Sequence, residues 1–212
     1  MKIYSTEYPS QLPPFVVKDL LERVPASIRQ KAGRYRRWQD AYGCLFGRLL
    51  LWRGLTDLGY AGDLNDLRYS AYGKPYLDDG PYFNISHSGN RVACILSNNG
   101  PIGIDLEKIS DQPIPEYKEQ FSDCEWNDIL NAPAPLAMFY HYWTAKESIL
   151  KADGRGLNLD LGALDVTGPV AEVDSLSWNL RPITSFRDYA CHIAYQAATG
   201  IPEIEDLFPG SF

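Results

Sequence analysis

Two acidic residues stand two positions apart in a short apolar segment, residues 103–107 (GIDLE). The pattern is typical of a β-strand, in which alternate side chains share a face, so Asp105 and Glu107 should point the same way. Neighbouring carboxylates repel each other unless a cation lies between them. Hard oxygen ligands suit Mg²⁺, which binds a few carboxylates together with substrate phosphates. The alternative is an exposed edge strand with solvated acids, and the pair alone does not decide between the two.

A third acid, Glu147, belongs to the segment 143–151 (WTAKESILK). Helical spacing places it beside the apolar face that includes Trp143 and Leu150. A carboxylate in that position must be paired, protonated or bound to a metal, because burying a bare charge is costly. Lys151 follows one turn later, so the alternative is a Glu–Lys pair that stabilises a surface helix.

A histidine flanked by hydroxyl groups lies in the segment 84–89 (NISHSG), where a strand runs into a glycine turn. Hydroxyl and imidazole groups on short side chains can donate hydrogen bonds to an anion, so Ser86 and His87 are candidates for phosphate binding. The alternative is a histidine with a structural role. A Ser–His nucleophile pair is not expected, because adjacent strand residues face opposite sides. The chain also has no G-x-S-x-G, Walker or G-x-G-x-x-G motif.

The segment 29–37 is basic in a chain that is acidic overall. The whole chain has 20 Lys and Arg against 27 Asp and Glu, a net charge of −7, which argues against a general nucleic-acid binder. A local basic run without acids suits a ligand rich in phosphate, and the alternative is a solvated helix face. Its members are Arg29, Lys31, Arg34, Arg36 and Arg37.

The elements that must position these residues alternate between helix and sheet. A helical pattern covers 27–55 and predicts one long helix, frayed at Gly33 and Gly43. A strand through 68–70 leads into a Gly-Lys-Pro turn at 73–75. Three closely spaced runs then predict strands of an antiparallel meander, at 82–87, 91–97 and 101–107.

The second half of the chain repeats this order. Ser122 and Glu125 form a capping-box pattern that predicts a helix over 123–131, and a longer helix covers 136–151. Short strands are expected at 163–166, 177–180 and 190–195. The sequence therefore predicts an α+β fold of two similar lobes, 1–104 and 105–212, each a small antiparallel sheet packed with helices.

The composition of the chain indicates the broad class of protein to which it belongs. The 212 residues are 45% apolar and 22% charged, an ordinary globular balance. The first residues carry no apolar core fit for a signal peptide, and no stretch has the length of a membrane span. The four cysteines are scattered and read as reduced thiols. We expect a soluble, cytoplasmic, monomeric protein that binds neither membrane nor nucleic acid.

Five segments together resemble the Sfp-type 4′-phosphopantetheinyl transferases. They occur in the family's order and spacing and cover roughly residues 30 to 160. The matching segments are 73–75 (GKP), 83–88 (FNISHS), 103–107 (GIDLE), Phe121-Ser122 with Glu125-Trp126, and 143–151 (WTAKESILK).

The resemblance implies two α+β lobes with coenzyme A in the cleft between them. It implies transfer of the phosphopantetheine arm to a serine of an apo acyl or peptidyl carrier protein, which leaves adenosine 3′,5′-bisphosphate. In the family, the residues that match Asp105, Glu107 and Glu147 bind Mg²⁺. The glutamate matching Glu147 also helps to deprotonate the serine, and the lysine matching Lys151 contacts the pyrophosphate.

The resemblance also assigns the nucleotide end of coenzyme A. It places Lys74 and Pro75 at the adenosine, and Ser86 and His87 at the 3′-phosphate, with help from basic residues of the N-terminal helix. Family members often carry a basic residue where this chain has Gly43. Lys31 or Arg48 are candidates to supply the missing contact.

Other readings stay open. One is another Mg²⁺-dependent enzyme of nucleotides or phosphoesters, and one is a non-catalytic module that binds coenzyme A or a carrier protein. The exposed, proline-rich segment 110–135 is a candidate docking surface for the carrier. The carrier's pathway (fatty acid, polyketide, nonribosomal peptide or lysine) and the tolerance of acylated coenzyme A are not readable from the sequence.

Overall fold

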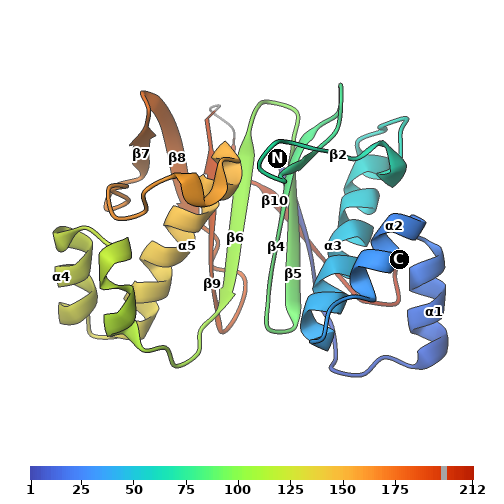
Figure 1. The fold of residues 1–212 in the computed structure, drawn as a ribbon, viewed down its shortest axis with the longest axis horizontal. Helices are drawn as coiled ribbons and strands as arrows, with labels where there is room; N and C mark the ends of the chain where they lie inside the picture. The colour runs from blue at the N-terminus through green and yellow to red at the C-terminus, as the bar shows by residue number, and fades with distance from the viewer. Residues whose placement is uncertain (197–199) are drawn as a thin grey trace. The chain divides into compact units, whose positions relative to one another are not determined.

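Figure 1 shows the computed structural model of the chain, which describes residues 1–196 and 200–212. The chain forms two compact units, Met1–Asn99 with Thr199–Phe212, and Gly100–Ala198. The expected limits, 1–104 and 105–212, differ from these units in two ways. Residue 104 lies inside the strand β6 (Ile102–Lys108), and the C-terminal segment belongs to the first unit.

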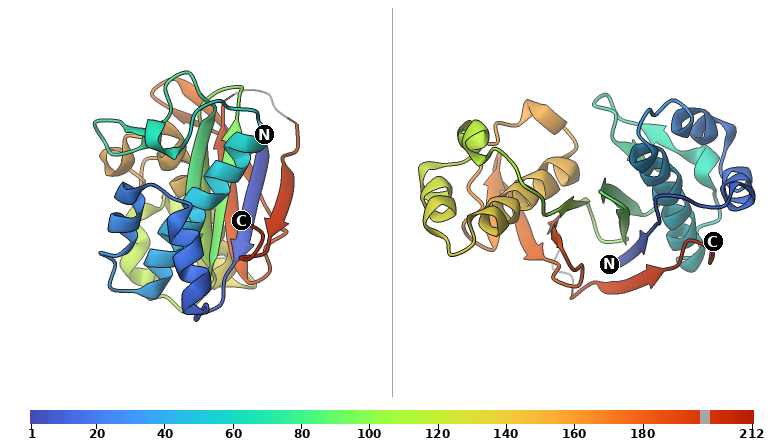
Figure 2. Two further views of the ribbon diagram at one scale, coloured as in Figure 1. Left: turned by 90° about the vertical axis from the view of Figure 1, so that its right-hand side faces the viewer. Right: turned by 90° about the horizontal axis from the view of Figure 1, so that it is seen from below.

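The first unit is built on a sheet with the strand order β10-β1-β5-β4. Strand β5 (Arg91–Ser97) pairs antiparallel with both β1 (Lys2–Glu7) and β4 (Tyr82–Ser88). Strand β10 (Glu203–Leu207) runs parallel to β1, and Figure 2 shows the two side by side. The β4–β5 hairpin confirms the first two strands of the expected meander.

Helices cover one face of this sheet (Figure 1). The helix expected over 27–55 is wrong as a single element, because α2 (Ala26–Ala32) ends at Gly33 and α3 (Trp38–Asp57) begins five residues later. A glycine inside a helix costs about 1 kcal/mol relative to alanine, and the like charges that follow it in the segment 34–37 (RYRR) give the helix no support.

Short elements complete the first unit. They are α1 (Pro14–Glu22), a 3₁₀ turn η1 (Leu64–Asp66), and the two-stranded ribbon of β2 (Arg68–Tyr69) and β3 (Pro75–Tyr76). The core lies between α3 and the sheet, where Phe46 stacks on Tyr8 with ring centroids 5.1 Å apart.

The second unit carries an antiparallel sheet in the order β6-β9-β8-β7. Its strands after β6 are β7 (Val170–Val173), β8 (Leu176–Pro182) and β9 (Tyr189–Tyr195). The expected third strand of the meander therefore exists but pairs with β9, not with β5. The strands expected at 177–180 and 190–195 are confirmed as β8 and β9.

Helix α5 (Pro135–Asp153) packs across this sheet and confirms the expected long helix. It ends at Gly154, whose φ of 89° is the left-handed conformation that glycine adopts without strain. Helix α4 (Asp123–Asn131) begins with the expected capping box, since Ser122 and Glu125 each accept a hydrogen bond from the other's backbone amide. The 3₁₀ turns η2 (Ile114–Gln120) and η3 (Gly156–Asn158) flank the two helices.

The strand expected at 163–166 is wrong. Leu164 and Val166 are buried, but the backbone groups there bond to side chains and not to another strand. The Lys146 ammonium donates to the carbonyls of Leu161 and Leu164, and the amide of Val166 donates to Glu125.

This arrangement depends on a fully buried ion pair. Lys146 and Glu125 are both unexposed, with Nζ and Oε2 2.8 Å apart. Burial lowers the pKa of Lys146, and the hydrogen bond to Glu125 opposes that shift. The pair ties α4, α5 and the loop around 161–166 together, and Lys146 stands immediately before Glu147 in the chain.

We expect Lys146→Met to lower the free energy of unfolding by about 3–5 kcal/mol, because Glu125 would keep its charge in a buried place without a cation. Urea denaturation measures the loss. The double variant Lys146→Met/Glu125→Leu should recover part of it, since no unpaired charge remains. A double variant less stable than the single one would contradict this account.

No helix in the described parts of the chain is both long and apolar enough to cross a membrane. The four cysteines are free thiols, with Cys94 and Cys191 buried and Cys124 exposed.

Candidate active site

A glycine on β6 lets the helix α5 lie directly on the strand. A Cβ atom at Gly103 would run into the carbonyl oxygen of Ser148 and lie 2.5 Å from the amide nitrogen of Ala152. Contacts under 3.0 Å are not made by real Cβ atoms, so only glycine allows this approach. The face of β6 that carries Gly103 also carries Asp105 and Glu107, and it is therefore turned towards α5.

We expect Gly103→Ala to displace α5 and to lower the free energy of unfolding by about 1–3 kcal/mol, as overpacking does. Turnover should fall by more than the loss of folded protein explains, because the acids of β6 and α5 would no longer lie close together. Gly33→Ala is the matched control, since its Cβ would meet nothing closer than 3.5 Å. Turnover in Gly103→Ala equal to that of the control would contradict the prediction.

The acids on β6 and the lysine on α5 meet in this unit. Asp105 is only 1% exposed, and Lys151 Nζ lies 2.5 Å from its Oδ1 atom. Burial lowers the pKa of Lys151, but the charges of Asp105, Glu147 and Glu107 raise it, and the net shift is upward. Three carboxylates from two elements thus act on one positive charge.

Glu147 has a pKa that is shifted in the direction that suits a base. Burial raises the pKa of Glu147 above its ordinary value of 4.5, and the Asp105 charge raises it further, while Lys151 opposes both. Within the described residues, its carboxylate makes neither a hydrogen bond nor an ion pair. A half-buried carboxylate with a raised pKa is suited to accept a proton from a substrate.

A divalent cation fits this donor set chemically. Carboxylate oxygens are the ligands that Mg²⁺ prefers, and the charges of all three act on the Lys151 ammonium. Over residues 1–196 and 200–212, however, no group of three or more His, Cys, Asp or Glu side chains is arranged closely enough to hold a metal ion. The Lys151 ammonium is the cation that these acids share in this structure.

A buried histidine that the sequence did not single out supports the site. His192 lies directly across from Asp105 in the β6–β9 pairing. Burial, with a smaller contribution from the nearby His141, lowers the pKa of His192 to about 3, so the ring is neutral. Thr144 donates its hydroxyl proton to the carbonyl of Tyr140, so the same Oγ1 accepts from Nδ1 of His192 at 2.8 Å. Because the ring is neutral, it adds no charge to that of the three acids and Lys151.

Lys74 and Pro75 lie on the β2–β3 ribbon of the first unit. Gly73 adopts a left-handed φ of 81°, and its amide donates to the carbonyl of Ser70. The amide of Lys74 donates to the Ser70 hydroxyl at 3.1 Å, and the Ser70 amide donates back to the Lys74 carbonyl. The expected turn is confirmed, and it holds the backbone of Lys74 in place.

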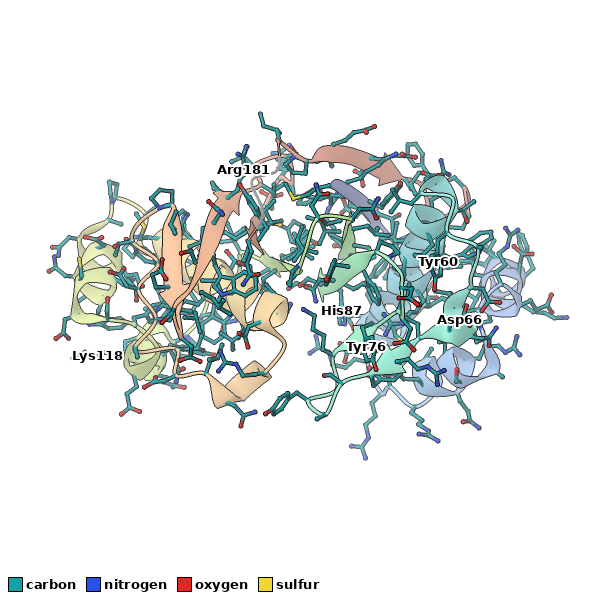
Figure 3. All side chains as sticks on the ribbon, turned by 90° about the horizontal axis from the view of Figure 1, so that it is seen from above. Tyr60, Asp66, Tyr76, His87, Lys118 and Arg181 are labelled. Carbon is teal, nitrogen blue, oxygen red and sulfur yellow. The ribbon has the colours of Figure 1, made fainter. Side chains whose placement is uncertain are left out.

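The structure places Ser86 and His87 on opposite faces of β4. Ser86 is buried, whereas His87, labelled in Figure 3, is exposed and turns its ring towards α3 at Gly43. The alternation of a strand explains the difference. Sequence spacing alone had grouped the two side chains.

Lys31 and Arg48 come together near the same turn of α3. Burial raises the pKa of the Cys44 thiol, and the charges of Arg48 and Lys31 lower it, so both cations lie near this residue. Cys44 follows Gly43, which contacts His87. Lys31 is exposed, as are the other basic residues of 29–37, at positions 29, 34, 36 and 37.

The chain matches a known protein family and several known proteins. A family model described as the 4′-phosphopantetheinyl transferase superfamily matches residues 101–194. The chain is 36% identical over 172 residues to the 4′-phosphopantetheinyl transferase Sfp of Bacillus subtilis (strain 168), a match that covers 78% of this chain and 76% of the relative. It is 34% identical over 158 residues to the 4′-phosphopantetheinyl transferase gsp of Aneurinibacillus migulanus, covering 73% of this chain and 66% of the relative.

Among solved structures, the holo-[acyl-carrier-protein] synthase (AcpS) of Thermotoga maritima aligns with a TM-score of 0.36 and 15% identity, over 45% of this chain and 62% of that chain. The sequence relatives are the ones that match over most of both chains. By this similarity the chain belongs to the 4′-phosphopantetheinyl transferase superfamily and is a transferase enzyme of that family.

Proposed function

We propose that the protein transfers the 4′-phosphopantetheine arm of coenzyme A to a serine of an apo acyl or peptidyl carrier protein, with Mg²⁺, and releases adenosine 3′,5′-bisphosphate. The observation that carries the proposal is that Lys151 contacts Asp105 directly and that the charges of Glu107 and Glu147 act on the same ammonium in the second unit. Transfer of a phosphoryl group depends on positioning and charge stabilisation, which such a cluster supplies.

The acids have distinct roles in this proposal. Asp105, Glu107 and Glu147 would hold Mg²⁺, which when bound supplies positive charge beside the pyrophosphate. Glu147 also accepts the proton of the acceptor serine at its carboxylate, a role that its raised pKa supports. Lys151 keeps its proton and offers its positive charge to the departing phosphate, because its pKa is raised by the same acids.

Residues of the first unit bind the nucleotide end of coenzyme A. Lys74 and Pro75, on a turn whose backbone is fixed, contact the adenosine. His87 binds the 3′-phosphate together with Lys31. Ser86 contributes through its backbone, because its side chain lies on the other face of β4.

Carrier docking is assigned to the segment 110–135. This segment holds η2 and α4, where Leu130 is 58% exposed. Beneath it, Phe121 packs against Phe139 and Trp143 with ring centroids 5.5 and 6.5 Å away, so the surface rests on a packed aromatic cluster. An apolar side chain above a packed base is suited to contact a carrier.

The experiment is intact-mass analysis of apo carrier proteins after incubation with the enzyme, coenzyme A and Mg²⁺. A gain equal to one phosphopantetheine arm is expected, and it should disappear with EDTA or when the acceptor serine of the carrier is replaced by alanine. Fatty-acid, polyketide and peptide carriers are tested in parallel. Binding of coenzyme A with no gain on any carrier would favour a binding module, and hydrolysis of nucleotides without a carrier would favour a different phosphoester enzyme.

A further inference from the structure

A hydrogen bond between two buried side chains joins α5 to β9. Thr144 Oγ1 lies 2.8 Å from Nδ1 of His192, and the two residues are 0% and 4% exposed. The same Oγ1 donates its proton to the carbonyl of Tyr140, so the imidazole N–H is the donor in the bond to Thr144. Apolar packing is not directional, whereas a hydrogen bond has a preferred distance and angle. The bond therefore ties one position of the helix to one position of the sheet.

The bond lies next to the acids on both elements. His192 is directly across from Asp105 in the β6–β9 register, and residues directly opposite in an antiparallel pair share a face. On α5, Thr144 is three residues before Glu147, and residues at that spacing are neighbours on one helix face. The bond thus joins the helix position beside Glu147 to the strand position beside Asp105.

A second polar contact holds α5 on the other side of Glu147. Lys151, four residues after Glu147, lies 2.5 Å from Oδ1 of Asp105 on β6. This contact is ionic and involves an acid that the proposed function assigns to Mg²⁺. The Thr144–His192 bond involves none of the three acids, and its imidazole is neutral. It can therefore hold α5 in place whichever cation Asp105 contacts.

We propose that Thr144 and His192 are positioning residues for the Glu147 carboxylate, because their hydrogen bond fixes α5 on β9 beside Asp105. The inference rests on the proposed function, since it takes Glu147 as the base of the transfer. It adds that a threonine hydroxyl and an imidazole, neither of them assigned to substrate or metal, determine where that base stands.

The pKa of Glu147 tests the proposal without substrate or metal. Burial and the charge of Asp105 raise this pKa, and both depend on where α5 lies against the sheet. Lys151, which opposes the shift, moves with Glu147 because the two are on one helix. Thr144→Val keeps the shape but accepts no hydrogen bond, so it should lower the pKa of Glu147 towards its ordinary value of 4.5. NMR titration of the metal-free protein measures the shift, and Thr144→Ser, which keeps the acceptor, should retain the raised pKa.

Turnover gives the second readout. Thr144→Val should lower kcat by about 10- to 100-fold, the cost of a small misplacement of a catalytic group. The KM for coenzyme A should stay within about 2-fold, because the residues assigned to its nucleotide end belong to the first unit. Ser148→Ala is the matched control. Ser148 is also an unexposed hydroxyl on α5, but it donates at 2.7 Å to the carbonyl of Ala145 in the same helix, so its loss should leave kcat and the pKa of Glu147 unchanged.

A double variant separates positioning from stability. Thr144→Val alone leaves the imidazole N–H of His192 buried without its acceptor, whereas Thr144→Val/His192→Leu removes both polar groups. Replacing both partners by apolar groups of similar shape can be nearly neutral for stability. The double variant should therefore melt closer to the wild type than Thr144→Val does. It should nevertheless keep the low kcat and the lowered pKa of Glu147, because nothing directional holds the helix.

The outcomes decide the proposal even if Thr144→Val does not fold, because the double variant then supplies the same two readouts. A wild-type pKa of Glu147 in the variants that lack the bond would overturn it. Recovery of kcat in the double variant would also overturn it, since the bond would then serve stability alone, and so would an equal loss in Ser148→Ala. The proposed function fails separately, by absence of transfer to any carrier, which the pKa measurement does not use.

Discussion

Replacing Asp105 by asparagine should lower turnover by about 10²- to 10³-fold, the size of effect seen when one group that stabilises transition-state charge is removed. The reason is its position. Asp105 is the most buried of the three acids that share a positive charge, and its carboxylate contacts Lys151 directly. Asparagine keeps the shape and can still accept a hydrogen bond from the lysine, so the protein should stay folded.

The choice of asparagine follows from a difference between sequence and structure. The strand pattern alone predicts that a carboxylate on a strand face lies outside the core, where even alanine would leave the fold intact. At 1% exposure Asp105 is part of the core, and Asp105→Ala would leave the Lys151 ammonium beside an empty space. Loss of activity in the alanine variant would therefore mix chemistry with stability.

Steady-state kinetics with an apo carrier protein measures the loss, and thermal unfolding checks the fold. Glu107→Gln is the matched control on the same strand face, because Glu107 is only half buried. It should lose less activity than Asp105→Asn. A folded Asp105→Asn enzyme with near-normal turnover at saturating Mg²⁺ would show that Asp105 does not hold the metal.

Local signals predicted the elements that carry the acids. The spacing of apolar residues in α5, the Ser122–Glu125 capping box and the Gly73 turn each depend on residues within a few positions. Such signals can be read from sequence without knowing the rest of the fold. They were enough to place Glu147 and Lys151 on one helix.

Pairing between distant strands could not be predicted in the same way. β6 follows β5 closely in sequence, yet it pairs with β9, more than eighty residues later, and β1 pairs with β10 at the other end of the chain. Nothing in the sequence of β6 indicates which strand it pairs with. The apolar residues at 163–166 misled for a related reason, since their backbone partners are the side chains of Lys146 and Glu125.

Packing contacts of glycine also lie beyond sequence patterns. Gly43 was identified as a departure from a family pattern, and Gly103 as the first residue of an acidic motif. Only the structure shows what each glycine contacts, the ring of His87 in one case and the backbone of α5 in the other. Because α5 must touch the strand for its acid to reach those of β6, the second contact determines the site.

Replacing Glu147 by glutamine should lower kcat by about 10²- to 10⁴-fold, the usual contribution of a general base. Glutamine has the same shape but cannot accept the serine proton. The pKa of Glu147 gives a second readout in the metal-free protein, where NMR can follow the carboxyl group. Asp105→Asn should lower the pKa of Glu147, because the Asp105 charge raises it, and Lys151→Met should raise that pKa further, because Lys151 opposes the shift.

The raised pKa of Glu147 also determines how the difference in stability between the wild type and Glu147→Gln changes with pH. Between 4.5, its ordinary value, and its higher value in the fold, Glu147 binds its proton more tightly in the folded state than in the unfolded one. The stability due to this group is therefore present below pH 4.5 and is lost as pH rises through that window. Metal-free Glu147→Gln should match the wild type at low pH and become the more stable of the two as pH increases. If instead the wild type gains stability over Glu147→Gln as pH rises, the carboxylate is stabilised in the fold, and its role as a base loses its physical support.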